Sequence, residues 1–168
     1  MGEIAVVKEY QVAKLADNIS DKAGALVEPA AVAAYGVERA GVRGGDIVLV
    51  TGAGPLGALS ALYANAVGAA TVIVAEPNPF RSDWAKKLDV GPVLDPTKDG
   101  FAEKIKDLTG GQGVDLAIEC SGTTPGLQTA MSSTRRSGKV VQTGLHTKPA
   151  TIDAMTMAAH DITFYGKI

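Results

Sequence analysis

Three glycines at Gly-x-Gly-x-x-Gly spacing, Gly52, Gly54 and Gly57, follow the apolar run Ile47–Val50. An acidic residue, Glu76, ends the next apolar run, nineteen residues after the last glycine. Gly52 permits a tight turn, Gly54 lets the backbone approach a pyrophosphate, and Gly57 lets the following helix pack closely on the strand. A buried strand, a glycine turn, a helix start and a distant acid together predict a dinucleotide-binding βαβ unit.

The residues just after the turn fit the same interpretation. Backbone N–H groups at the start of a helix, together with its dipole, can hold a diphosphate. Pro55 falls in that first turn, where a missing N–H does little harm, and the apolar Leu56 follows it. The alternative at this point is a purely structural glycine-rich turn in another α/β protein.

The choice of nicotinamide cofactor depends on two residues of opposite charge. A carboxylate at Glu76 can accept hydrogen bonds from the ribose hydroxyls of the adenosine and would repel a 2′-phosphate, which favours NAD. Arg81 lies five residues later and favours NADP, because an arginine there can accommodate that phosphate. The acid at the strand tip is the more direct determinant, so we expect NAD.

Apolar runs alternate with helix-like stretches from Asp46 onward. The predicted strands are Ile47–Val50, Thr71–Ala75, Val93–Leu94, Val114–Ile118, Lys139–Gln142 and Ile162–Tyr165. The predicted helices are Leu56–Val67, Phe80–Leu88, Gly100–Leu108, Pro125–Thr134 and Met155–His160. Strict alternation and continuous Val/Ile/Leu runs indicate a parallel sheet covered on both faces. The fold class is therefore α/β: a doubly wound, six-stranded parallel Rossmann sheet.

Ligands of such sheets bind at the carboxyl ends of the strands. The small residues expected there are Cys120, Ser121 and Gly122 after the fourth strand and Thr143, Gly144 and Leu145 after the fifth. A buried structural thiol is an equal alternative for Cys120. His146 and His160 fit packing or surface positions better than catalysis.

The chain before Asp46 does not continue this pattern. Glu3–Ala16 resembles one or two short strands without a partner in the parallel sheet, so we expect residues 1–20 to be a remnant of a catalytic domain. Ser20 can cap a short helix and Pro29 suits the first turn of a second one, which Gly41 would end. Residues 21–45 are then connecting helices, and residues 46–168 the NAD-binding domain.

Composition excludes several classes of partner. The 168 residues carry a net charge of −2, and the Arg135–Arg136 pair, expected at a solvated helix end, is too short for a nucleic-acid patch. No apolar run is long enough for a membrane span and no signal peptide opens the chain. A single cysteine fits a reducing cytoplasm. We therefore expect a cytoplasmic protein without nucleic-acid or membrane partners.

Several short motifs occur in register and carry a specific resemblance. They are Val27-Glu-Pro29, Gly52-Ala-Gly-Pro-Leu-Gly57, Glu76-Pro77, Leu94-Asp-Pro96, Thr109-Gly-Gly-Gln-Gly-Val-Asp115 and Glu119-Cys-Ser-Gly122. Over nearly its whole length the chain resembles the cofactor domain of zinc-type medium-chain dehydrogenases, in the branch of butanediol, sorbitol, xylitol and threonine dehydrogenases.

The resemblance implies oxidation of a secondary alcohol or polyol to a ketone, with hydride passing to NAD and zinc polarising the alcohol oxygen. It implies that Gly52, Gly54 and Gly57 hold the pyrophosphate, that Leu56 touches the cofactor, and that Glu76 and Arg81 flank the adenosine. The loops Cys120–Gly122 and Thr143–Leu145 would line the nicotinamide half. Glu28 matches a glutamate that reaches the catalytic zinc, and the sixth strand would pair across a two-fold axis in a homodimer.

The chain also departs from the family. The zinc-binding cysteine, the Gly-His-Glu motif and the structural-zinc cysteines have no counterpart in this sequence, so we expect the 168-residue chain to bind NAD without binding catalytic zinc or turning over substrate. The alternatives are a zinc-free, NADP-dependent quinone-type reductase and a non-catalytic NAD-sensing module. Glu76 disfavours the first, and the strand remnant at Glu3–Ala16 disfavours the second.

Overall fold

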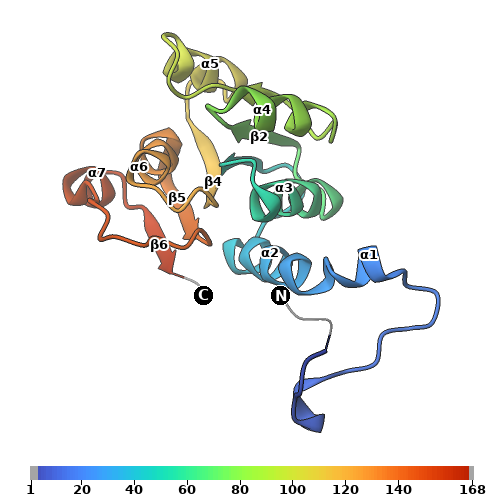
Figure 1. Cartoon of the computed structure of the whole chain (residues 1–168). Coiled ribbons are helices and arrows are strands. Elements are labelled where there is room, and N and C mark those ends of the chain that lie inside the picture. The colour runs from blue at the N-terminus through green and yellow to red at the C-terminus, as the bar shows by residue number, and fades with distance from the viewer. Residues whose placement is uncertain (1–3, 167–168) are drawn as a thin grey trace.

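The apolar runs form a single parallel sheet in the computed structural model, which describes residues 4–166 (Figure 1). Its strands are β1 (Ile47–Thr51), β2 (Thr71–Ala75), β3 (Val93–Leu94), β4 (Val114–Glu119), β5 (Thr134–Gln142) and β6 (Thr163–Gly166). Neighbouring strands all pair in parallel, in the order β3-β2-β1-β4-β5-β6. The order reverses between β1 and β4, which makes the carboxyl ends of these two strands the topological switch point. The predicted fold class is confirmed.

Helices connect the strands and cover both faces of the sheet. They are α1 (Asp21–Gly24), α2 (Val27–Ala40), α3 (Pro55–Ala66), α4 (Pro79–Lys86), α5 (Phe101–Leu108), α6 (Thr124–Ser133) and α7 (Ala154–Ala159). Between β1 and β6 the boundaries lie within two residues of the predicted spans, and β2 and β3 match them fully; small differences at helix and strand ends are common. The exception is β5, which begins at Thr134 instead of Lys139. Its first residues are irregular: the pairing register shifts between Val114 and Leu116, and Ser137 has a φ of 54°.

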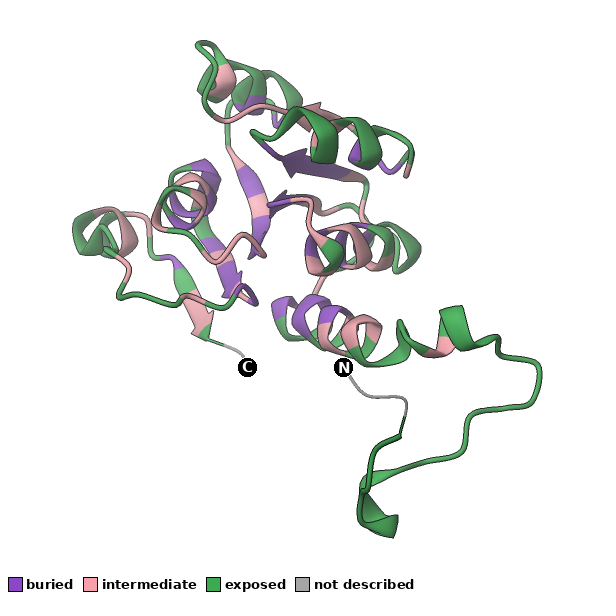
Figure 2. Cartoon of the chain, in the orientation of Figure 1, coloured by how far each residue is buried: buried purple, intermediate pink, exposed green. Residues whose placement is uncertain are grey.

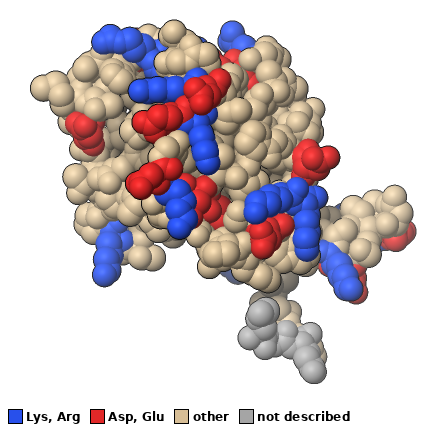
Figure 3. Space-filling model, turned by 90° about the horizontal axis from the view of Figure 1, so that it is seen from above, with Lys and Arg blue, Asp and Glu red and all other residues tan. Residues whose placement is uncertain are grey.

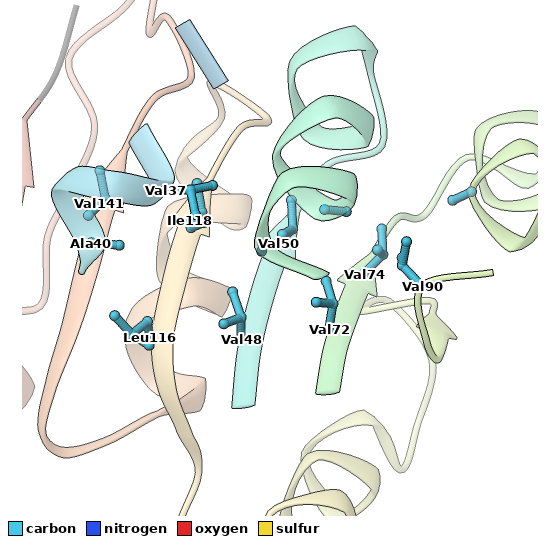
Figure 4. Close-up of a cluster of buried hydrophobic side chains, with 13 residues drawn as sticks. Val37, Ala40, Val48, Val50, Val72, Val74, Val90, Leu116, Ile118 and Val141 are labelled. Carbon is cyan, nitrogen blue, oxygen red and sulfur yellow. The ribbon is translucent and has the colours of Figure 1, made fainter. Parts of the chain in front are cut away.

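Successive residues of each strand enter two separate cores. Val48 and Val50 of β1 belong to a cluster with Val37 of α2 and Ala61 of α3, and Figure 4 shows this face of the sheet. Leu49, between them, packs into the opposite cluster, which takes residues from α5 and α6. Because a strand presents its side chains alternately to its two faces, helices on both faces allow every residue of such a run to be apolar. Each fully buried Val or Leu contributes about 1.5–3 kcal/mol.

The segment before α1 differs from the prediction. Residues 4–20 contain no strand; they form one short 3-10 helix, η1 (Glu9–Gln11), within an exposed arm (Figures 1 and 2). Ile4 and Val6 are 88% and 99% exposed. The prediction of strands over Glu3–Ala16 is therefore wrong for its described residues; Glu3 lies outside them. A strand requires the backbone N–H and C=O groups of a neighbour, and no described strand lies against the arm.

The local signals between the arm and the sheet are confirmed. The Ser20 side chain accepts a hydrogen bond from Ala23 N at 3.3 Å and so caps α1. Pro29 lies in the first turn of α2, and Gly41 ends that helix in the left-handed conformation, with a φ of 71°. Figure 2 shows purple, buried residues at the end of α2 that meets the sheet. This helix therefore belongs to the packed body of the protein.

The Arg135–Arg136 pair is a second correction, because it lies at the start of β5 and not on a helix end. Arg135 Nε donates to Asp115 Oδ1 at 2.7 Å, and Arg136 donates to the backbone oxygen of Ala159 at 2.9 Å. On the face drawn in Figure 3, positive and negative side chains are interspersed. Among residues 4–166, no helix is both long and apolar enough to cross a membrane.

Candidate cofactor-binding site

The three glycines have three different environments. Gly52 has a φ of +89°, and Gly57 packs so closely that a Cβ on it would lie 1.9 Å from the Gly52 carbonyl oxygen. Gly54 is the N-cap of α3, and a Cβ there would have no heavy atom within 4 Å. Gly52 and Gly57 are thus required by the turn itself. The open space at Gly54 leaves room for a ligand against the backbone.

Glu76 holds this turn against the end of β2. Its carboxylate accepts a hydrogen bond from Ala53 N at 2.7 Å through Oε2 and from Asn78 N at 2.8 Å through Oε1. The residue is only 3% exposed. Because a carboxylate has about four lone-pair sites, each oxygen retains the capacity to accept another hydrogen bond. Glu76 therefore combines a structural contact with an available acceptor at the end of β2, next to the switch point.

A pocket opens beside the turn at the carboxyl ends of β1, β2 and β4. Its walls are built from the strand tips, the loop after β3 and the start of α6. The lining residues are Thr51, Gly52, Gly54, Ala75, Glu76, Pro77, Arg81, Pro96, Thr97, Cys120, Ser121, Thr123, Pro125, Gly126 and Thr129. This is the location at which open α/β sheets bind nucleotides.

The residues present fit a dinucleotide. Gly54 caps α3 without a side-chain hydrogen bond, so the helix start is open to a phosphate. The Thr51 hydroxyl is buried at the pocket wall and has no hydrogen-bond partner among residues 4–166, so it can bond to a ligand. The Glu76 carboxylate can bind a ribose, and the N-terminus of α3 can bind a diphosphate. The apolar wall around Pro77 and Pro96 can contact a base.

The structure distributes the predicted site residues over two neighbouring places. Lining the pocket are Gly52, Gly54, Glu76, Arg81, Cys120 and Ser121. Pro55, Leu56 and Gly57 form the first turn of α3 beside it. Gly122, Thr143, Gly144 and Leu145 do not line this pocket; they belong to adjoining loops after β4 and β5. Thr143 faces α2, since its Oγ1 would lie 2.8 Å from a Cβ on Gly36.

Cys120 Sγ lies 3.6 Å from Ser60 Oγ of α3, so this half-buried thiol both packs on the helix and borders the pocket. Glu28 lies elsewhere, exposed in the first turn of α2.

Sequence reasoning missed the residue that joins the two loops. Glu119, at the end of β4, is fully buried, and its carboxylate bonds to Ser121, Gly122 and His146. Its position at a strand tip was an available signal, because the carboxyl ends of the strands carry the ligand in this class of sheet. The start of α6 and the Pro96–Thr97 loop were missed as pocket walls for another reason: only folding brings them to the β1 and β2 tips.

The described residues do not bring together the ligands of a zinc centre. Within residues 4–166, no three or more His, Cys, Asp or Glu side chains are grouped so that they could hold a metal ion. Structural and catalytic zinc sites need three or four such ligands. The described residues therefore do not fit a zinc site by themselves.

The sheet order, together with a glycine turn that is hydrogen-bonded to the Glu76 carboxylate, defines a dinucleotide-binding domain of the Rossmann class. The profile of the family named zinc-binding dehydrogenase matches residues 55–168. The chain belongs to this family, as its motifs indicated.

Relatives agree with the branch that the sequence resembles. The (R,R)-butanediol dehydrogenase of Neisseria gonorrhoeae is 32% identical over 100% of this chain and 48% of its own length. The L-threonine 3-dehydrogenase of Pyrococcus horikoshii is 36% identical over 98% of this chain and 47% of its own length. The chain thus spans about half the length of these curated relatives.

Solved structures share the fold over the same extent. The 2R,3R-butanediol dehydrogenase of Bacillus subtilis superposes with a TM-score of 0.83 at 35% identity, covering 93% of this chain and 45% of that one. A chain from Sinorhizobium meliloti 1021, solved bound to NADP, superposes with a TM-score of 0.74 at 25% identity, covering 83% of this chain and 42% of that one.

Proposed function

We propose that this chain is the NAD-binding part of a zinc-type dehydrogenase that oxidises a secondary alcohol or polyol to a ketone. The main observation behind the proposal is the open backbone at Gly54, together with the Glu76 carboxylate at the end of β2, next to the switch point of the sheet. The relatives named for butanediol and threonine support the substrate class. In such a reaction this chain would bind and orient the dinucleotide, and its buried strand tips would keep water from one side of the cofactor.

The preference for NAD rests on the charge at the end of β2. Because the Glu76 carboxylate lines the pocket, a ribose diol can donate to it, whereas a 2′-phosphate would meet a negative charge held in place by two backbone amides. Arg81 lines the same pocket and supplies the opposite charge, and a structural neighbour was solved with NADP. Glu76 is buried while Arg81 is exposed, so the carboxylate is the better-positioned determinant.

Titration of the 168-residue chain with NAD and with NADP tests this proposal. We expect NAD to bind at least about tenfold more tightly, the worth of one charge-assisted hydrogen bond. Glu76→Gln should remove most of that preference, and Arg81→Ala, the matched change at the other charged residue of the pocket, should leave it or increase it. Tighter binding of NADP by the unaltered chain would contradict the assignment and favour a zinc-free reductase.

Catalysis requires groups that we propose lie in the part of the relatives outside this match. The described residues do not form a zinc site, and the role of Glu28 as a carboxylate near zinc stays a prediction from the resemblance. We expect the 168-residue chain to bind NAD and to produce no NADH from 2,3-butanediol, sorbitol or threonine. Stoichiometric zinc by metal analysis, or NADH formation by this chain, would overturn the expectation.

We also propose a homodimer through β6. This strand pairs with β5 on one side and ends the sheet, so its other edge can pair with a second copy. Light scattering should give twice the chain mass, and Thr163→Lys on the exposed edge should shift the protein toward monomer. Thr147→Lys, on an exposed loop, is the control. A monomeric unaltered chain would count against the proposal. A cytoplasmic location stays a prediction, supported by the single cysteine.

A further inference from the structure

Glu119 is a fully buried carboxylate, 0% exposed, at the carboxyl end of β4. Its Oε1 accepts three hydrogen bonds: from Ser121 N at 2.7 Å, from Ser121 Oγ at 2.5 Å and from Gly122 N at 2.9 Å. Such a buried charge is costly unless it is fully hydrogen-bonded. One oxygen of this carboxylate is thus devoted to the loop after β4.

The rest of the residue holds the loop after β5. Its Oε2 lies 3.2 Å from Nε2 of His146, whose side chain is only 10% exposed. Its backbone oxygen accepts hydrogen bonds from Thr143 N at 2.8 Å and Gly144 N at 2.7 Å. A single residue of β4 therefore binds both loops, through its side chain and its main chain.

The two loops also touch directly, at positions where only glycine fits. A Cβ on Gly122, whose φ is +64°, would lie 2.5 Å from the Leu145 carbonyl oxygen. A Cβ on Gly144 would lie 2.4 Å from Gly122 N and 2.7 Å from Glu119 Oε2. The contact leaves little room for either loop to shift alone, so a change at Glu119 or His146 would move both.

The position of these loops indicates what they serve. The pocket on the β1 and β2 side holds the groups suited to the adenosine and diphosphate, and Cys120 and Ser121 form its border toward β5. A dinucleotide bound across the switch point continues from one half of the sheet to the other. Its second half must therefore pass over the loops that Glu119 holds.

We propose that Glu119, clamped to His146, is a positioning residue that fixes the loops Cys120–Gly122 and Thr143–Leu145 to receive the nicotinamide half of the cofactor. This inference rests on the proposed NAD binding. Glu119 and His146 act through the two loops and do not contact the reacting atoms themselves. Loss of the clamp should weaken the interaction with the nicotinamide half and leave the adenosine half unchanged.

The test compares NAD with ADP-ribose, which lacks the nicotinamide, on the 168-residue chain. We expect His146→Ala to lower NAD affinity about tenfold, the worth of one hydrogen bond to a charged group, and to change ADP-ribose affinity less than about twofold. His146→Gln, which keeps an N–H donor, should restore most of the loss. His160→Ala is the matched control, because that histidine lines a different pocket.

A second readout is independent of ligand. Hydrogen exchange at the amides of Gly122 and Gly144 should quicken in His146→Ala while the melting temperature stays close to that of the unaltered chain.

If Glu119 only stabilised the fold, the affinities for NAD and for ADP-ribose would fall together in His146→Ala, and the inference would be overturned. Equal NAD affinity in His146→Ala and the unaltered chain would also overturn it, leaving the proposed function intact. An unaltered chain that binds neither ligand would instead overturn the proposed function.

Discussion

At the residue scale, Gly57 and Gly54 serve the same turn for different reasons. The Gly52 carbonyl oxygen occupies the space where a side chain on Gly57 would begin, at 1.9 Å. At Gly54 the space is open and the backbone is extended, with a φ of −71°, so alanine can adopt the conformation. Gly57 is therefore needed for packing, and Gly54 only for the approach of a ligand.

This difference predicts that alanine substitutions at the two positions affect different properties of the chain. Gly57→Ala should destabilise the chain by about 1–3 kcal/mol or more, because the methyl group overpacks the turn. Gly54→Ala should cost about 1 kcal/mol or less, the weaker N-cap preference of alanine, while lowering NAD affinity at least about tenfold. Urea unfolding and NAD titration measure both. A Gly54→Ala chain that binds NAD normally would contradict the assignment of this residue to the pyrophosphate.

At the scale of elements, Asp115 joins three strands. Its Oδ2 accepts a hydrogen bond from Ile47 N at the start of β1 at 2.7 Å, and its Oδ1 accepts one from Arg135 of β5 at 2.7 Å. The carboxylate lies in β4, between these two strands. One side chain thus secures the amino ends of the central strands, opposite the candidate site.

Asp115→Ala should therefore destabilise the chain by about 1–3 kcal/mol, because it leaves a partly buried N–H and a guanidinium without their acceptor. Chemical unfolding measures the change. Asp83→Ala is the matched control, since Asp83 forms an exposed pair with Lys86 at 2.9 Å and should change the stability by less than about 1 kcal/mol. Equal effects of the two substitutions would argue against a role for Asp115 in joining the strands.

The short helix α7 depends on a charged N-cap. The Thr156 hydroxyl donates to Asp153 Oδ2 at 2.7 Å, and the Thr156 and Met155 amides donate to Oδ1. The Thr156 side chain and then its amide hold the pKa of Asp153 below its ordinary value. Since the folded pKa is the lower one, the cap is fully stabilising above the ordinary pKa and loses this contribution as the pH falls through the folded value.

Thr156→Ala should therefore raise the pKa of Asp153 toward its ordinary value, and α7 should fray at a higher pH than in the unaltered chain. An NMR titration that follows the Met155 amide measures both. Thr147→Ala, on an exposed loop, should leave the titration unchanged. A pKa of Asp153 that does not respond to Thr156→Ala would refute the assigned cause.

At the scale of the whole molecule, the chain divides at α1. The arm over residues 4–20 is exposed throughout, whereas α2 buries Val37 and Ala40 in one cluster with residues of α3 and the sheet. We propose that the folding unit begins near Ser20 and includes α2. The sequence-based division assigns α2 to the connecting helices of residues 21–45. Under this proposal α2 belongs instead to the cofactor domain.

Two deletions test this boundary. Removal of residues 1–18 should leave the unfolding free energy within about 0.5 kcal/mol, because no buried side chain of the described arm is lost. Removal of residues 1–45 should cost more than about 3 kcal/mol, since it uncovers one apolar face of the sheet. Circular dichroism and urea unfolding report both. Equal stability of the two shortened chains would place the boundary after α2.

Much of the fold was predictable from the sequence because its signals are local. Continuous Val and Ile runs mark strands covered on both faces, and Gly52 through Gly57 with Glu76 mark the turn and the site beside it. The caps at Ser20 and Gly41 follow from the same kind of short-range chemistry. The arm was not predicted correctly, because apolar residues such as Val6 and Val7 suggest a strand whether or not a neighbour is present to pair with it.

The sequence by itself thus determined the alternation of strands and helices, the glycine turn and the class of ligand, since each depends on residues close together in the chain. The tertiary structure alone decided that Arg135 meets Asp115, that Pro96 and Thr97 wall the pocket, and that Glu119 binds His146. These partners are separated in sequence and become neighbours only because the strands pair in the order β3-β2-β1-β4-β5-β6. Which polar groups meet at the strand tips is therefore a property of the sheet order, which no short motif encodes.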